Sequence, residues 1–163
     1  MDFKQTIRAS FSSADFISQA YLNDLTDKEL MQRPAPGANH IAWQLGHLIS
    51  SERALAELGA PGMMPALPDG FAEKHKKETA SVDDPAKFLT KTQYVALARE
   101  IRAATLKALD HVAPADMNLP INGKAPPFVK LRGEAFATIA PHWLLHAGQW
   151  VLVRRSIGRP VMF

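Results

Sequence analysis

Two histidines, His142 and His146, lie four residues apart in the mostly apolar segment PHWLLHAGQWVLVRR, residues 141–155. On a helix, side chains at positions i and i+4 share one face, with Cβ atoms about 6 Å apart. Both imidazoles could therefore bind one metal ion, at roughly 2.0–2.1 Å per nitrogen for zinc. Histidine is also often buried and satisfied by ordinary hydrogen bonds, so the pair alone leaves both interpretations open.

A third histidine ligand has one good candidate in the first half of the chain. His47 lies in WQLGHL among apolar neighbours, and Gly46 leaves room beside it; a core histidine without a ligand role is the alternative. His40 is expected to be solvated at the start of the same helix. His75 in a lysine-rich loop and His111 at a helix end are expected at the surface.

The chain has no cysteine, which limits both metal binding and catalysis. Any metal must be bound through nitrogen and oxygen, since thiolate ligands are absent. A cysteine nucleophile is excluded for the same reason. If the protein catalyses thiol chemistry, the thiol must come from a second small molecule.

Composition indicates one globular domain, residues 1–163, with 47% hydrophobic and 21% charged residues. The net charge of +3 is too small to indicate a nucleic-acid partner, and no basic stripe interleaved with aromatic residues is present. No apolar window reaches the length of a membrane span, and Asp2, Lys4 and Arg8 interrupt any signal sequence. We therefore expect a cytoplasmic protein without a nucleic-acid or membrane partner.

Four helical segments must position the histidines. Apolar residues at steps of three and four predict helices over residues 2–23, 40–58, about 84–110 and about 131–157. Asn39 is the expected N-cap of the second helix, and Asp84-Pro85 the expected start of the third. Thr26 and Glu29 match a capping box for a short helical turn. The pattern predicts an all-α four-helix bundle with a long, irregular loop over residues 59–84, between the second and third helices.

The fourth helix has apolar residues on nearly every side, which predicts that most of its surface is buried. Pro141 is unusual within it, because proline lacks an N–H and crowds the carbonyl of Ala137. We expect Pro141 either to kink this helix or to mark its start. Arg154, Arg155 and Arg159 at its end complement the negative end of the helix dipole.

The segments PGANHIAWQLGHLISSE and HWLLHAGQ, about ninety-five residues apart, resemble the DinB-like (YfiT/DinB) superfamily. The matching features are an Asn before the second helix, W-x-x-G-H-L, and H-x-x-x-H-x-G-Q on the last long helix. The resemblance covers essentially the whole chain and implies a four-helix bundle, a divalent metal ion and, in many members, a homodimer. Carried over by position, the implied metal ligands are His47, His142 and His146.

Three protein ligands would leave a position open on the metal, as in catalytic zinc sites. Hydrolysis usually also needs a general acid or base, but the neighbours of the three histidines on the helical wheel include no carboxylate. Glu52 lies about 140° from His47 around its helix. This favours activation of a small thiol for S-transfer or addition to a small molecule, with zinc as the first expectation for the metal and nickel as the second. A hydrolase that uses metal-bound hydroxide and a non-catalytic metal-binding stress-response bundle are the alternatives.

Gln149 follows the histidine pair on the same face and is the candidate for orienting a ligand ring or the metal-bound group. A hydrogen bond between helices is an equally good explanation of Gln149. No residue is assigned as catalytic. The lysines of the long loop are expected to be solvated. The side chains expected to wall the pocket are Trp43, Gln44, Ser51, Thr138 and Trp150.

Overall fold

The computed structural model describes residues 2–162, and these residues form a helical bundle. Within this range there is no strand, only an isolated antiparallel bridge between Pro120 and Leu131. The elements, in chain order, are α1 (Phe3–Leu22), α2 (Asp27–Leu30), α3 (Ile41–Gly59), the 3-10 turns η1 (Glu73–His75), η2 (Lys77–Thr79) and η3 (Pro85–Lys87), α4 (Lys91–His111), η4 (Pro114–Asn118) and α5 (Arg132–Ser156). The expected all-α four-helix bundle is confirmed.

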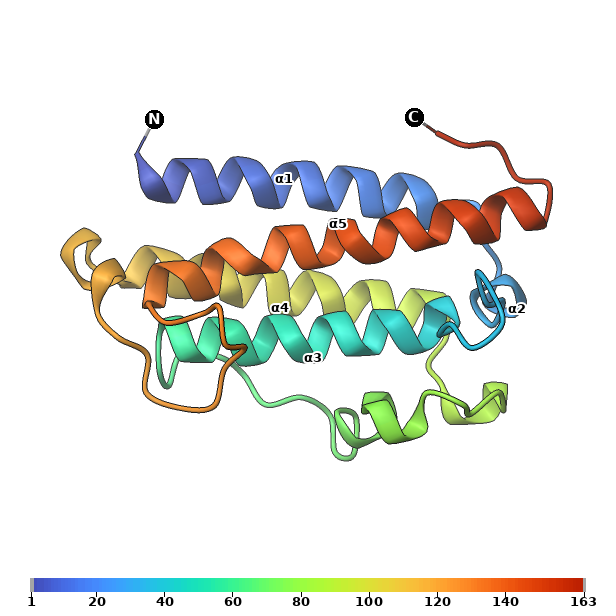
Figure 1. Ribbon diagram of the computed structural model, residues 1–163, viewed down its shortest axis with the longest axis horizontal. Helices are drawn as coiled ribbons and strands as arrows, with labels where there is room; N and C mark the ends of the chain where they lie inside the picture. Colours follow the sequence, from blue (N-terminus) through green and yellow to red (C-terminus); the bar gives the residue numbers. More distant parts are fainter. Residues whose placement is uncertain (1, 163) are drawn as a thin grey trace.

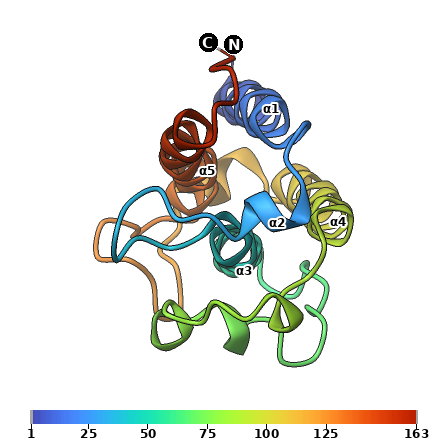
Figure 2. The same ribbon diagram turned by 90° about the vertical axis from the view of Figure 1, so that its right-hand side faces the viewer.

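The four long helices, α1, α3, α4 and α5, lie side by side along the long axis of the molecule (Figure 1). Seen end-on, they occupy the four corners of the bundle (Figure 2). α5 packs against α1 and α3, and α3 also packs against α4. The three helical contacts bury a continuous apolar core that includes Phe11, Ile49, Phe136 and Trp150.

The long connection between α3 and α4, residues 60–90, is here called the crossing segment. α3 and α4 run in the same direction, so this connection has to return along the length of the bundle (Figure 1). It does so over the outer side of α3 (Figure 2). The predicted long loop is therefore present, but it contains three short 3-10 turns and inserts Met64, Phe71 and His75 into the core.

The crossing segment corrects two predictions about histidines. His40, expected to be solvated, is fully buried, and its Nε2 lies 3.0 Å from the carbonyl oxygen of Val82. His75, expected at the surface, is only 3% exposed. Its imidazole packs directly on Gly46, where a Cβ atom would lie 2.2 Å from the ring. Both rings are buried because the crossing segment folds back onto α3.

Two predicted helix starts are also wrong. α3 is capped by His40 rather than Asn39, because the Nδ1 atom of His40 accepts a hydrogen bond from the backbone N–H of Trp43 at 3.0 Å. Asp84 caps only the single turn η3. α4 begins at Lys91, where Thr90 and Gln93 form a capping box that satisfies two backbone N–H groups reciprocally. The predicted capping box at α2 is confirmed.

α5 continues through Pro141, so Pro141 does not mark the start of this helix. Two of the three arginines near the end of α5 do more than complement the helix dipole. Arg154 is fully buried, donates to the carbonyl oxygen of Tyr21 at 2.8 Å and forms an ion pair with Asp24. Arg159 forms an ion pair with Glu29 at 3.0 Å. These contacts join the end of α5 to α1 and α2.

Candidate metal centre

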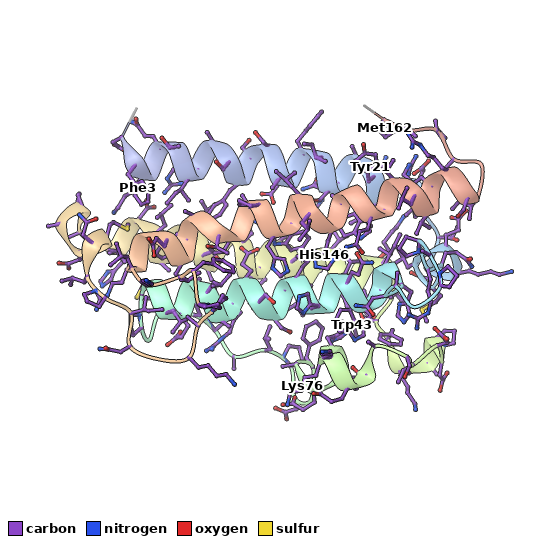
Figure 3. The ribbon with its side chains drawn as sticks, in the orientation of Figure 1. Phe3, Tyr21, Trp43, Lys76, His146 and Met162 are labelled. Carbon is purple, nitrogen blue, oxygen red and sulfur yellow. The ribbon has the colours of Figure 1, made fainter. Side chains whose placement is uncertain are left out.

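Three imidazoles from two helices meet between α3 and α5. His47 comes from α3, while His142 and His146 come from adjacent turns of α5. One ring nitrogen of each lies within 4.8 Å of the others. The Nε2 atoms of His47 and His142 are 3.2 Å apart, close to the separation of about 3.3 Å between two nitrogens on one tetrahedral zinc ion. Figure 3 shows His146 between the two helices.

A buried glutamine, Gln44, fixes the orientation of the His146 ring. The amide nitrogen of Gln44 donates to the carbonyl oxygen of Asn39 at 2.6 Å, which assigns Oε1 to the other side of the amide. That oxygen accepts from the indole N–H of Trp150 at 2.9 Å and lies 3.0 Å from Nδ1 of His146. Since Oε1 is only an acceptor, Nδ1 of His146 carries the proton, and the lone pair of Nε2 is available for a metal.

The protonation states of the rings suit metal binding. Burial lowers the pKa of His47, and it lowers the pKa of both His142 and His146 to about 4, with the neighbouring imidazoles adding to the shift. All three rings are therefore neutral near pH 7, which is the form that binds a metal ion. The donor set, the convergence and the fixed tautomer of His146 together fit a divalent cation that accepts imidazole ligands.

Trp43 and Thr79 connect the histidine group to the crossing segment. The indole of Trp43 stacks on the His47 ring, with ring centroids 5.1 Å apart and an interplanar angle of 10°. Its Nε1–H donates to the hydroxyl of Thr79 at 3.2 Å. Thr79 in turn donates to backbone carbonyl oxygens of the same segment. Trp43 thus packs behind a candidate ligand, and it is held there by residues 60–90.

A cavity of about 670 Å³ opens beside His47 and His142. This volume lies within the range of about 300–1,000 Å³ that is typical of small-molecule sites. Its walls come from α3, α5 and the loop that joins α4 to α5, residues 119–131. The lining residues are His47, Ser51, Ala54, Leu55, Leu58, Lys124, Pro126, Phe128, Thr138, Pro141, His142 and Leu145.

The residues predicted to wall the pocket divide into two groups. Ser51 and Thr138 line the cavity. Trp43, Gln44 and Trp150 do not line it: they lie in the core, where each is at most 5% exposed. Among these three, Gln44 contacts a candidate ligand through a hydrogen bond, with the ring of His146. Its position three residues before His47, on the same helix face, was the sequence signal for this role.

Gln149 contacts Gln44 rather than a ligand ring. Its Oε1 accepts from the amide nitrogen of Gln44 at 3.1 Å, which forms a hydrogen bond between α5 and α3. The side chain of Gln149 is therefore connected to that of His146 only through Gln44. Of the two explanations given for it, the hydrogen bond between helices describes the observed contact.

No Asp or Glu of residues 2–162 lines the cavity. Glu52, one turn beyond His47, faces the opposite side of α3 and forms a buried ion pair with Arg102 at 2.8 Å. Its other oxygen accepts from the indole N–H of Trp143 at 2.7 Å. The carboxylate is thus committed to packing between helices, and the chemistry at the three imidazoles has no carboxylate partner among the cavity walls.

Comparison with known proteins finds a family whose model matches the sequence and solved structures with a similar fold. The profile of the DinB superfamily matches residues 17–150, which include all three histidines. A conserved protein from Enterococcus faecalis has a similar structure, with a TM-score of 0.71, 18% identity, and coverage of 98% of this chain and 99% of the other. A DinB-like protein from Bacillus cereus gives a TM-score of 0.70 at 17% identity, with coverage of 98% and 97%. No curated protein is a significant match in sequence.

Proposed function

The chain belongs to the DinB superfamily, and from this premise we propose that it is a divalent-metal-dependent enzyme that activates a small thiol for transfer or addition to a second small molecule. One observation carries the proposal: three imidazoles converge beside a cavity that two of them line, and the described residues of its walls include no carboxylate. We propose zinc as the first candidate for the metal and nickel as the second, since imidazole suits both.

The three histidines would hold the metal with at least one position left for a substrate. His47 and His142 line the cavity, so that open position would face it. When bound, a divalent ion lowers the pKa of a coordinated thiol enough to deprotonate it. The hydrogen bond from His146 to Gln44 keeps that ring in one orientation, and the stacked Trp43 restricts the ring of His47.

Hydrolysis is the competing reaction, and the cavity favours it less. A hydrolase generally has to protonate a leaving group, and glutamate or aspartate commonly supplies that proton. The hydroxyl of Thr138 already donates to the carbonyl oxygen of Glu134 at 2.7 Å. A thiolate needs no separate base once it has lost its proton to solvent, so the absence of an acid is compatible with thiol transfer.

Metal analysis tests the first half of the proposal. Protein purified without a histidine tag is expected to retain one divalent ion per chain, and the His146→Ala variant is expected to lose it while remaining helical. His111 is exposed at the end of α4, so His111→Ala serves as the control and should keep the ion. Equal metal content in the two variants would exclude the ligand assignment.

A screen of low-molecular-weight thiols with small electrophiles tests the second half. The metal-loaded protein should accelerate thiol consumption, and the His146→Ala variant should not. Ester and amide hydrolysis should be measured in the same samples. Metal-dependent hydrolysis without any thiol reaction would replace this proposal by a hydrolase, and no activity in either assay would leave a metal-binding bundle without catalysis.

A further inference from the structure

The cavity beside the histidines also indicates what kind of molecule it accepts. We propose that its ligand is a small amphipathic anion, with an apolar body bound by the cavity walls and a carboxylate or similar group bound by Lys124. This inference rests on the proposed function, because it names the substrate class of the same site.

Most of the cavity surface is apolar. Leu55 and Leu58 of α3 contribute one side, and Leu145 of α5 contributes another. Phe128 and Leu145 are 68% and 66% exposed, although both have large apolar side chains. Exposed apolar residues around a cavity are typical of ligand-binding sites, since a ligand with an apolar body removes them from water.

Lys124 is the only lysine among the described residues that line the cavity, and these residues include no arginine, aspartate or glutamate. Its ammonium group therefore has no carboxylate of the cavity wall to neutralise it. The described lining residues thus bring one ammonium group and no carboxylate, so an anionic ligand is favoured over a cationic one.

Backbone geometry holds Lys124 at this position. The preceding residue, Gly123, has a φ of 137°, in a region that residues with a Cβ rarely adopt. A Cβ atom at Gly123 would also lie 3.0 Å from Cδ2 of Leu58, so the backbone at Gly123 packs closely on a residue of the cavity wall. The bend at Gly123 therefore brings the next residue, Lys124, to the cavity beside α3.

The experiment uses 4-phenylbutyrate as the probe and its uncharged amide as the matched control ligand. Isothermal titration should give a lower Kd for the carboxylate than for the amide. Lys124→Gln should weaken carboxylate binding about threefold, the size expected for one solvent-accessible ion pair, and leave the amide unchanged. Lys130→Gln is the matched protein control: Lys130 lies in the same loop and does not line the cavity.

The same titration on metal-free protein separates this inference from the proposed function. If the wild type binds no metal but prefers the carboxylate through Lys124, the proposed function fails and the ligand class stands. If the protein binds metal, but Lys124→Gln and Lys130→Gln have the same Kd for the carboxylate, the inference is wrong. If carboxylate binding is lost when the metal is removed and is unchanged by Lys124→Gln, the carboxylate binds the metal. That result would also contradict the inference.

A steric variant checks that the probe occupies this cavity. Ala54 is exposed on α3 and lines the cavity, so Ala54→Trp should fill part of it without disturbing the core. We expect this variant to remain folded, to keep the metal and to lose measurable binding of both probes. Unchanged binding of both probes in Ala54→Trp would place them elsewhere and contradict the inference.

Discussion

Gln44 connects the core of the bundle to a candidate metal ligand. Its side chain makes four hydrogen-bond contacts: with Asn39, Gln149, Trp150 and His146. Each of its polar atoms is occupied, so the amide cannot rotate without breaking several buried hydrogen bonds. The orientation of His146 is therefore set by the packing of α3 against α5, before any metal binds.

Replacing Gln44 by leucine should weaken metal binding about 10- to 100-fold, the usual cost of losing a residue that orients a histidine ligand. The Gln149→Leu variant is the matched control, because Gln149 contacts the amide nitrogen of Gln44 and not the imidazole. Competition with a chelating dye measures both affinities. Equal losses in the two variants would show that the bundle, and not the contact with His146, sets the affinity.

His75 lies outside the histidine group, and its burial should make folding sensitive to pH. Its ring contacts the carbonyl oxygen of Phe71 and the hydroxyl of Tyr94, at 2.7 and 2.8 Å. Burial lowers its pKa to about 4. Below its unfolded pKa of about 6.5, the unfolded chain binds a proton that the folded chain does not. The free energy of unfolding should therefore fall as the pH drops from 6.5 towards 4.

The contribution of His75 can be isolated by substitution. Between pH 7 and pH 5, it should account for about 2 kcal/mol of the loss in unfolding free energy, at 1.4 kcal/mol per pH unit below 6.5. Urea unfolding of chelator-treated wild type and His75→Gln at the two pH values measures this difference. His111→Gln is the control and should lose as much as the wild type. If His75→Gln does so as well, the buried ring is not the source.

At the scale of helices, a buried ion pair joins α3 to α4. Glu52 and Arg102 form two hydrogen bonds at 2.8 and 3.0 Å, and Glu52 also accepts from Trp143 of α5. Burial raises the pKa of Glu52, against the opposing effect of Arg102. Both charged groups of the pair are thus removed from water. Replacing only one of them should therefore lower the stability of the protein strongly.

Glu52→Gln should destabilise the protein by about 3–5 kcal/mol, because it leaves the Arg102 guanidinium buried without its main counterion. The double variant Glu52→Leu, Arg102→Met removes both charges and should recover most of that loss. Urea unfolding at pH 7 measures all three proteins. A double variant less stable than Glu52→Gln would show that the ion pair itself stabilises the bundle.

The helices and the pairing of histidines could be predicted from local patterns. Apolar periodicity and caps predicted the four long helices. The start of α3 was wrong by one residue and that of α4 by about six, because His40 and Thr90 provide the actual caps. The burial of His40 and His75 could not be predicted, because it depends on the return of residues 60–90 along α3. Local sequence around His75 is rich in lysine, and the neighbouring lysines are indeed exposed: Figure 3 shows Lys76 pointing away from the bundle.

The candidate site could likewise be predicted only in part. His47, His142 and His146 were identified from spacing and from the family resemblance, and the structure brings them together. Lys124 and Phe128 were not identified, since their place at the cavity follows from the fold of the loop between α4 and α5. Long-range packing, which single-sequence patterns do not encode, decides which polar residues reach the cavity.

At the scale of the whole molecule, a metal at the three histidines would join α3 to α5. A ligand that binds only the folded protein stabilises it by about 2.7 kcal/mol at a free concentration one hundred times its Kd. Zinc at that concentration should therefore raise the Tm of the metal-free protein by about 5–10 °C. Differential scanning calorimetry measures the shift, and His146→Ala should show none. A similar shift in that variant would mean that zinc binds elsewhere.

The described residues include no helix long and apolar enough to cross a bilayer. The exposed apolar side chains of α5 at Leu145 and Leu152 are separated by seven residues and lie on a helix that is otherwise packed on α1 and α3. Leu145 lines the cavity, so its exposure is explained by the cavity of a single chain.

The separation of His47 from His142 in the chain has a consequence for synthesis. While the ribosome has released only the first half of the chain, a single imidazole of the group exists, and one imidazole binds metal weakly. The remaining two emerge with α5, more than ninety residues later in the chain. A metal held by all three imidazoles would therefore have to bind after α5 has been translated, when apolar packing of α3 against α5 can bring the rings together.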